Sequence, residues 1–269
     1  MADMFSLITF LGLLLAPLAC SQDIAETLCG QYGVYSAEPY LYNNNAWNEI
    51  SNSVEGAFHP FYTLWKWTSE PPVVHGFPDI ELKTDLLPLQ VSSLHALNVS
   101  ASWSLKPVSL IPGASADPNT QPDADALQAN GIQCNVALDM FADANAEASQ
   151  TPAKQKYEIM VWHARFGAAA VPIGWTSGAV ATITIGGSDY SLYTGTNSNG
   201  QTVLTWLANE TVTDFSFDVA PLMGFLVDQQ HLPSDVYLGT IQFGSETFYA
   251  DNQMNFSVSA FSACHWESP

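Results

Sequence analysis

The sequence predicts an all-β fold, a β-sandwich or jelly roll of two antiparallel sheets with one helix packed outside. Three observations support this prediction: short stretches of apolar–polar alternation recur along the chain, turn residues separate them, and a single segment has helical periodicity. The 269 residues, less a leader of 22, leave about 247, which suits one domain with a sizeable core. No internal repeat divides the chain, so we expect one domain over residues 23–269.

The expected strands follow from alternation, because successive side chains on a strand point to opposite faces. The clearest hairpin has strands at 181–185 and 190–193 around a Gly-Gly-Ser-Asp turn, and another strand follows at 202–206. Further strands are expected at 135–141, 157–162 and 241–248. Two segments rich in Ala, Asp, Pro and Gln are expected to be exposed loops, namely 114–130 and 142–155.

Residues 219–230 have the period of a helix rather than that of a strand. Asp218 can cap the N-terminus of this helix, and Pro233 follows its end. One apolar stripe would face the sheets, made of Val219, Leu222, Met223 and Leu226. This is the one helix that the sequence predicts, and we expect it to pack outside the sandwich.

Residues 1–22 are typical of a secretory signal peptide. The run 5–18 is mostly apolar and the residues at 19–21 are small, so we expect cleavage near Ser21 or Gln22, although the usual positive charge near the N-terminus is missing. The run is too short for a confident membrane anchor, and no other apolar stretch is long enough. We therefore expect a secreted, extracellular protein that does not associate with membranes.

The charge balance restricts the partners. The formal net charge is −20, from 26 acidic and 6 basic residues, which argues against nucleic acid and against polyanionic substrates. The same balance fits a neutral polysaccharide and an acidic working medium, and it fits equally well the solubility of a secreted protein. A monomer is the expected state.

Cysteines, histidines and sequons give weaker indications. Cys29, Cys134 and Cys264 remain after cleavage, so we expect one disulfide and one leftover thiol, with all three pairings open. The six histidines show no metal-ligand spacing and no Gly-rich phosphate loop follows a strand, so no metal and no cofactor are expected. N-glycosylation sequons begin at Asn98, Asn209 and Asn255.

Two glutamates on separate expected strands are the strongest functional signal. Glu158 shares a face with Met160 and Trp162, and Glu246 shares a face with Gln242. Two carboxylates set among aromatic and amide groups on one sheet surface are the groups that cleave a glycosidic bond. A single strand glutamate, by contrast, is most often a solvated surface carboxylate.

Four regions together resemble glycoside hydrolase family 12, the secreted endo-β-1,4-glucanases and xyloglucanases. Their order and rough spacing hold from Cys29 to the C-terminus: LCGQY (28–32) with YNNNAW (42–47), NVALDMF (135–141), YEIMVW (157–162) and QFGSETF (242–248). The resemblance implies a β-jelly roll of the concanavalin A type that hydrolyses β-1,4-linked glucan without a cofactor.

The resemblance assigns separate roles to the acids. It makes Glu158 the nucleophile and Glu246 the general acid/base of a hydrolase that retains the anomeric configuration, with carboxyl groups about 5–5.5 Å apart. Glu158 should then be ionised and Glu246 protonated at the start. Asp139 matches the third acid of the family and is expected to hydrogen-bond Glu158 while protonated. The alternative for Asp139 is an ordinary solvated strand carboxylate.

The resemblance also implies sugar-binding residues, because aromatic rings stack on sugars and amides bind hydroxyl groups. The expected set is Asn45, Trp47, Met160, Trp162 and Pro172, the last on a loop at the cleft rim. For the two tryptophans and Met160 the alternative is packing in the sheet core. Three further aromatic residues could extend the cleft or belong to the core, namely Trp65, Trp67 and Phe77.

The chain departs from the family pattern near the expected cleft rim. No second cysteine follows Cys29 within 50–62, and the usual glycine-rich stretch after the nucleophile strand is Gly-Ala-Ala-Ala at 167–170. These changes affect substrate preference more than catalysis, so a xyloglucan-specific endoglucanase is the alternative enzyme. A catalytically silent glycan-binding jelly roll is the alternative of another class.

Overall fold

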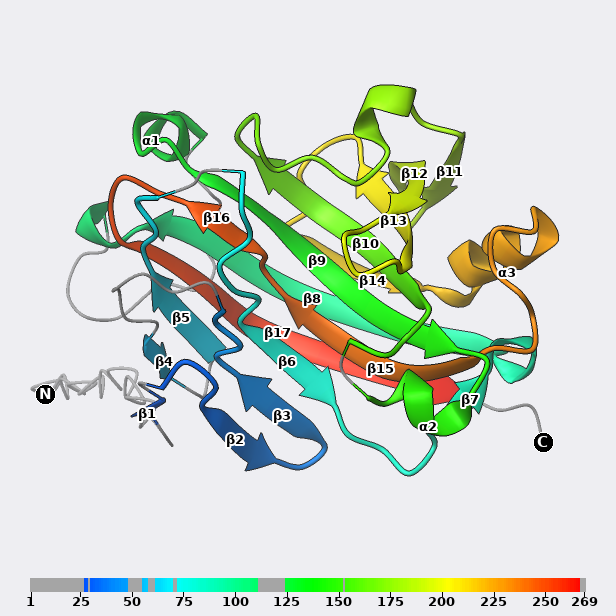
Figure 1. The fold of residues 1–269 in the computed structure, drawn as a ribbon. Coiled ribbons are helices and arrows are strands. Elements are labelled where there is room, and N and C mark those ends of the chain that lie inside the picture. The colour runs from blue at the N-terminus through cyan, green and yellow to red at the C-terminus, as the bar shows by residue number, and fades with distance from the viewer. Residues whose placement is uncertain are drawn as a thin grey trace, which may run out of the picture.

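The computed structural model describes residues 27–28, 30–47, 55–57, 61–69, 72–110, 124–151 and 153–266. Two twisted β-sheets pack face to face, and the helices lie at their edges and ends (Figure 1). The all-β sandwich predicted from the sequence is confirmed. The expected signal peptide and Cys29 lie outside the described residues.

The smaller sheet has six strands, and all its neighbouring strands are antiparallel. The two longest strands, β8 and β17, pair along most of their length. The order across the sheet is β1 (Thr27–Leu28), β4 (Glu55–Ala57), β5 (Phe61–Trp65), β17 (Met254–Trp266), β8 (Ala96–Pro107) and β14 (Asp214–Asp218).

The larger sheet has eleven strands and carries the candidate site. Two short strands pair outside its main path, β16 (Thr247–Tyr249) with β9 and β7 (Leu89–Gln90) with β15. The main order is β11 (Ala181–Ile185), β12 (Ser188–Thr196), β13 (Thr202–Ala208), β10 (Tyr157–Phe166), β9 (Gln133–Asp143), β15 (Tyr237–Gly244), β6 (Asp79–Leu82), β3 (Tyr40–Asn43) and β2 (Val34–Ala37).

One strand pair corrects the prediction of purely antiparallel sheets. β10 and β13 are parallel, with Glu158 opposite Val203 and Met160 opposite Thr205. The hairpin of β11 and β12 lies on the far side of β13, so the chain returns beside β10 in the same direction. Apolar–polar alternation is the same for either strand direction, which is why the sequence pattern did not reveal this pair.

The predicted helix forms as α3 (Ala220–Asp228), and its four-residue apolar stripe is buried as expected. Asp218 accepts hydrogen bonds at Oδ1 from the backbone N–H of Ala220 at 2.9 Å and of Leu97 at 2.7 Å. Its carboxylate therefore joins the start of α3 to β8 of the smaller sheet. In Figure 1 the helix lies at one end of the sandwich, outside both sheets.

The two segments predicted as exposed loops each contain a short helix, so that prediction was wrong in part. They form α1 (Ala124–Ala129) and α2 (Ala146–Ser149), and the side chains of Leu127, Ser149 and Gln155 are buried. Asn145 caps α2 by accepting the backbone N–H of Ala148 at 2.9 Å. Three 3₁₀ turns complete the helical elements among the described residues, at Val91–Ser93, Val108–Leu110 and Trp175–Ser177.

Gly239 allows α2 to pack against β15. A Cβ atom there would lie 2.5 Å from the backbone carbonyl carbon and oxygen of Ser149, which have little room to move. We expect Gly239→Ala to lower the free energy of unfolding by about 1–3 kcal/mol, measured by urea denaturation. Gly224→Ala in α3 is the control, because a Cβ there contacts nothing within 4 Å and should stabilise the helix by up to about 1 kcal/mol. Equal stability of the two variants would contradict this prediction.

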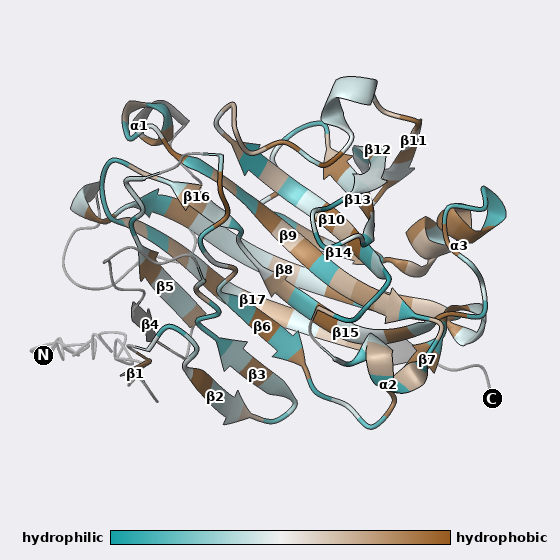
Figure 2. Ribbon diagram, viewed as in Figure 1, coloured by the Kyte–Doolittle hydropathy of each residue, from teal (hydrophilic) through white to brown (hydrophobic). Residues whose placement is uncertain are grey.

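Apolar side chains from both sheets form the main core, and hydrophobic and hydrophilic residues alternate along the strands (Figure 2). His163 is buried there, on the face of β10 opposite Trp162. Its ring stacks on Phe215 with centroids 3.7 Å apart, and Nδ1 lies 3.1 Å from the hydroxyl of Tyr190. Burial lowers the pKa of His163 to about 3, so its imidazole is neutral at physiological pH.

The structure describes two of the three remaining cysteines and all three sequon asparagines. Cys134 is a buried free thiol and Cys264 an exposed one, so the expected disulfide does not join these two residues. Asn98 and Asn209 are exposed, whereas only 3% of Asn255 is exposed. The sequon at Asn255 is therefore incompatible with a glycan in the folded protein.

Candidate active site

A cavity of about 950 Å³ lies across the larger sheet, over strands β3, β6, β15, β9, β10 and β13. Part of its lining belongs to a small apolar cluster that is separate from the main core. All but one of the residues predicted for the site line this cavity. They are Asn45, Trp47, Asp139, Glu158, Met160, Trp162 and Glu246.

Glu158 lies on β10 opposite Phe141 of β9, with its side chain facing the cavity. Its Oε2 accepts a hydrogen bond from Nδ2 of Asn197 at 3.1 Å. Burial raises the pKa of Glu158 to about 7, and the hydrogen bond from Asn197 opposes this rise. The carboxyl group is therefore poised to ionise near neutral pH.

Glu246 lies between β15 and β16 rather than on a continuous strand, which corrects the predicted strand 241–248. The register against β9 is nevertheless unbroken, because Gly244 lies opposite Ala137 and Thr247, three residues later, lies opposite Cys134. No residue is inserted, so Glu246 keeps the face predicted from strand parity.

The side chain of Asn135 on β9 interrupts this ladder and fixes Glu246. Asn135 Oδ1 accepts the backbone N–H of Glu246 at 2.9 Å, and Asn135 Nδ2 donates to Oε2 of Glu246. The backbone carbonyl of Asn135 is instead bonded by the hydroxyl of Ser245 at 2.5 Å. One amide thus holds both the main chain and the carboxyl group of Glu246.

Burial and a neighbouring charge shift the pKa of Glu246 further than that of Glu158. Burial has the larger effect, the charge of Glu158 adds to it, and the hydrogen bond from Asn135 opposes both, so that the pKa rises to about 8. The two carboxyl groups are therefore close enough to repel each other, and Glu246 is the one that holds its proton more strongly.

Asp139 lies on β9 next to both glutamates. Its buried Oδ1 accepts no hydrogen bond, and the bond that its protonated form would donate to Glu158 stays a prediction. The pKa of Asp139 is raised well above its usual value, first by burial and then by the charges of Glu158, Glu246 and Asp79. This shift favours the protonated form of Asp139, which is the form that the resemblance implies for the third acid.

The comparison with known proteins decides what this arrangement is. The model of glycosyl hydrolase family 12 matches residues 38–264, and both glutamates lie within the match. The chain belongs to glycosyl hydrolase family 12. It is 31% identical over 245 residues to a probable xyloglucan-specific endo-β-1,4-glucanase A of Aspergillus flavus, covering 87% of this chain and 89% of that protein.

Two further comparisons bear on the fold and on the activity of this family 12 hydrolase. Endoglucanase 3 of Trichoderma harzianum has the same fold, with a TM-score of 0.72 and 26% identity over 90% of this chain and 97% of the other. An inactive glycoside hydrolase of Phytophthora nicotianae is 28% identical over 249 residues, covering 89% of this chain and 92% of that protein. Membership of the family therefore does not by itself guarantee activity.

The predicted sugar-binding residues of this family 12 hydrolase differ in how far they reach the cavity surface. Trp162 and Met160 line the cavity as members of the apolar cluster and are each only 3% exposed, with the indole Nε1 of Trp162 3.3 Å from the Met160 sulfur. Trp47 packs at the edge of this cluster and is partly exposed. Pro172 is buried and does not line the cavity, whereas its neighbours Val171 and Ile173 do.

The structure also decides between cleft and core for Trp65, Trp67 and Phe77. Trp65 is fully buried and Trp67 is 3% exposed, so both belong to the core, where Trp67 Nε1 donates to the hydroxyl of Thr247 at 2.9 Å. Phe77 lines the cavity.

No group of three or more His, Cys, Asp or Glu that could hold a metal ion is found in the described part of the chain. Similarly, no helix there is long and apolar enough to cross a membrane.

Asn197 was missed by sequence reasoning, although it contacts the proposed nucleophile. Its Oδ1 accepts the backbone N–H groups of Asn199 and Gln201, and its Nδ2 also donates to Oε1 of Gln201 at 2.8 Å. These bonds fix the β12–β13 turn and aim the amide at Glu158. The turn-rich stretch 195–200 was visible in the sequence, but nothing in it indicated a partner on β10.

Removing this amide should shift the acid limb of the pH profile. The roles that the resemblance implies need Glu158 ionised and Glu246 protonated, so activity should fall below pH about 7 and above pH about 8. Asn197→Ala removes the bond that lowers the pKa of Glu158, so the acid limb should move up by roughly one pH unit. The alkaline limb should stay in place. The pH dependence of kcat/KM measures both limbs, and an unmoved acid limb would contradict the prediction.

Proposed function

We propose that this chain is a secreted, monomeric, retaining endo-β-1,4-glucanase that cleaves internal bonds of soluble or amorphous β-glucan. The observation that supports this most strongly is the pair of half-buried carboxyl groups in one cavity. Glu158 and Glu246 repel each other and differ in pKa, which gives one the ionised role and the other the protonated role.

In the first step Oε of Glu158 attacks the anomeric carbon of the sugar on the non-reducing side. The bond from this carbon to the bridging oxygen breaks, and that oxygen takes the proton of Glu246 as the leaving chain departs. The products are a glycosyl ester on Glu158 and an ionised Glu246. Neutral Asp139 beside them keeps a third negative charge out of the site.

In the second step water takes the place of the departed chain. Glu246 removes a proton from this water, the water oxygen attacks the anomeric carbon, and the ester bond to Glu158 breaks. Two inversions restore the β-configuration, and the proton taken by Glu246 regenerates the starting state. Asn135 holds Glu246 throughout, because its amide bonds both the backbone and the carboxyl group.

The test follows the hydrolysis of barley β-glucan by reducing-end release, viscosity and early-time proton NMR. An endo-acting retaining enzyme lowers the viscosity before many reducing ends form, and its first new ends are β-anomers. Initial release of α-anomers would contradict retention. A protein that binds the glucan without releasing any ends would instead be a silent glycan-binding protein, a class to which the inactive relative draws attention.

Xyloglucan is the second candidate substrate, because the similar protein of Aspergillus flavus is named a probable xyloglucan-specific endoglucanase. The choice depends on whether the cleft admits xylose branches. Initial rates on xyloglucan, carboxymethyl cellulose and barley β-glucan at equal mass concentration decide between the two. A rate on xyloglucan that exceeds the other two by tenfold would replace the general endoglucanase proposal with the specific one.

A further inference from the structure

Asp79 is a buried acid beside the cleft for which neither the sequence pattern nor the proposed mechanism provides a role. It is the first residue of β6 and is fully buried. Among the described residues one ion pair is found, between Lys83 and Glu81, so no cation neutralises Asp79. A buried carboxyl group without a cation is costly and must be balanced by hydrogen bonds.

Two amides supply those hydrogen bonds, one to each carboxyl oxygen. Asn43 Nδ2 lies 2.9 Å from Oδ1 of Asp79, and Asn45 Nδ2 lies 3.4 Å from Oδ2. Asn43 and Asn45 both line the cavity, whereas Asp79 does not. The acid is therefore placed behind two amides that face the substrate.

The surrounding backbone is shaped to hold Asp79 in this place. Gly244 of β15 lies opposite Asp79, and a Cβ atom on it would lie 2.9 Å from Cβ of Asp79 and 2.3 Å from the carbonyl oxygen of Pro78. On the other side Asp79 pairs with Asn43 of β3. Only a glycine at 244 leaves room for this acid between the two strands.

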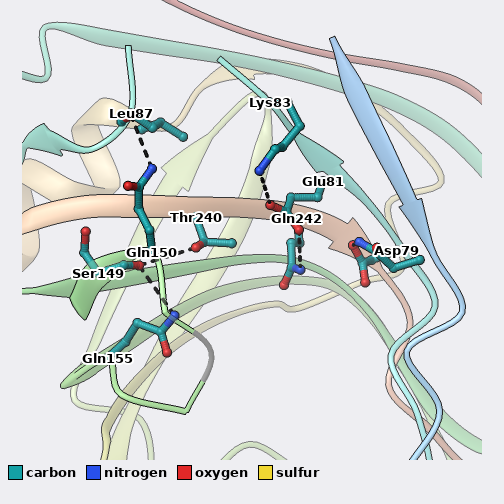
Figure 3. A network of polar contacts seen from close by, with 10 residues as sticks. Asp79, Glu81, Lys83, Leu87, Ser149, Gln150, Gln155, Thr240 and Gln242 are labelled. Atoms are coloured by element: carbon teal, nitrogen blue, oxygen red, sulfur yellow. Dashed lines mark hydrogen bonds and ion pairs between the residues drawn. The ribbon is translucent and has the colours of Figure 1, made fainter. Parts of the chain in front are cut away.

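Two backbone hydrogen bonds connect the segment around Asp79 to the cleft amides and to the segment of Glu246. The backbone N–H of Phe77 donates to the carbonyl of Asn45 at 2.9 Å, and that of Ser245, next to Glu246, lies 3.3 Å from the carbonyl of Pro78. Figure 3 shows Asp79 next to Glu81 on β6, with Gln242 bonded to Glu81. The segment with Asp79 thus lies between the amides and the acid/base residue.

We propose that Asp79 is a positioning residue that holds the amides of Asn43 and Asn45 in one orientation for hydrogen bonding to sugar hydroxyl groups. An exposed amide on a solvated strand end samples several rotamers and both flip states, and fixing it before binding removes that entropic cost. The ligand is a β-linked glucose chain, so the inference rests on the proposed function for the nature of the ligand.

The test compares Asp79→Ala, Asp79→Asn and wild type by kinetics on soluble β-glucan. Asp79→Ala should raise KM by roughly fivefold to tenfold and change kcat less than threefold, because the catalytic carboxyl groups are untouched. Asp79→Asn keeps the shape and one acceptor but turns a donor toward the other amide, so it should restore only part of the lost affinity. An unchanged KM in Asp79→Ala would overturn the inference.

Asp218→Ala is the matched control for a merely structural effect. Asp218 is also a carboxylate that accepts two hydrogen bonds, but it lies at the start of α3 and does not line the cavity. Its loss should lower the melting temperature and leave KM unchanged. If Asp79→Ala behaves in the same way, Asp79 only stabilises the fold and the inference is wrong.

Binding without turnover separates this inference from the proposed function. Calorimetric titration of cellotetraose into Glu158→Gln, with and without Asp79→Ala, should show weaker binding in the double variant by the same factor as the change in KM. Intact binding without hydrolysis by wild type would contradict the proposed function alone. Normal hydrolysis by wild type, with equal cellotetraose affinity in the single and the double variant, would contradict the inference alone. If no variant bound cellotetraose, both the inference and the proposed function would be contradicted.

Discussion

Glu158→Gln is expected to lower kcat for β-glucan hydrolysis by on the order of 10⁵-fold while the protein still binds the glucan. The amide has nearly the shape of the carboxylate but cannot attack the anomeric carbon. Loss of this residue therefore removes the covalent route and not merely a binding contact. The measurement is reducing-end release at high enzyme concentration, with glucan affinity followed in the same preparation.

Glu147→Gln is the matched control for this change. Glu147 lies in α2 at the protein surface, and its side chain does not line the cavity. The same chemical change there should leave kcat and KM as in wild type. Residual activity of Glu158→Gln within tenfold of wild type would remove Glu158 from the role of nucleophile.

Glu246→Gln is expected to lower kcat on β-glucan by roughly 10²–10⁴-fold, because the leaving sugar oxygen then departs without a proton. An activated aryl cellobioside, such as the 2,4-dinitrophenyl derivative, needs no proton to leave. The glycosylation step should therefore be nearly normal with this substrate, and a burst of the phenolate should precede slow turnover. Equal losses on both substrates would contradict the assignment of Glu246 as the general acid/base.

The same variant also tests the raised pKa of Glu246 through stability. The pKa of this group is about 8 in the folded protein and 4.5 in its ordinary state. Its contribution to stability is therefore fully present below pH 4.5 and is lost as the pH rises through about 8. The amide introduced by Glu246→Gln cannot ionise, so the variant should unfold at a higher temperature than wild type at pH 8 and show no such gain at pH 4. Equal melting temperatures at pH 8 would argue against a desolvated, destabilised carboxylate.

The expected near-neutral activity window differs from the acidic one that the composition suggests. A net charge of −20 fits an acidic working medium, but that charge is spread over a whole surface in contact with water. The pKa values of the two glutamates depend instead on burial and on each other. Local desolvation therefore decides the pH dependence, and the overall charge says little about it.

The sequence predicted the parts of the site that repeat with strand period. Alternation placed Glu158 and its two neighbours on one face, and the parity of Glu246 survived the break between β15 and β16. The reason is that a strand has a fixed period of two, so the face of each residue follows from local order. The apolar stripe of α3 was predictable for the same kind of reason.

The supporting residues could not be found in this way, because their partners are distant in sequence. Asn135 bonds Glu246 across 111 residues, Asn197 bonds Glu158 across 39, and Asn43 bonds Asp79 across 36. Asparagine is a common turn and strand-end residue, and nothing local marks one that supports a catalytic group. The parallel pairing of β10 with β13 and the burial of Pro172 were hidden for the same reason.

The sequence by itself determined that this protein is an all-β sandwich with two acids on one sheet face, since periodicity and composition are local properties. The tertiary structure alone decided how those acids differ. It partly buried both, set Glu158 beside Asn197 and Glu246 beside Asn135, and placed Asp79 behind the amides of the cleft. Desolvation and hydrogen bonding act through space between strands that only the folded chain brings together, and they give two chemically identical side chains separate pKa values.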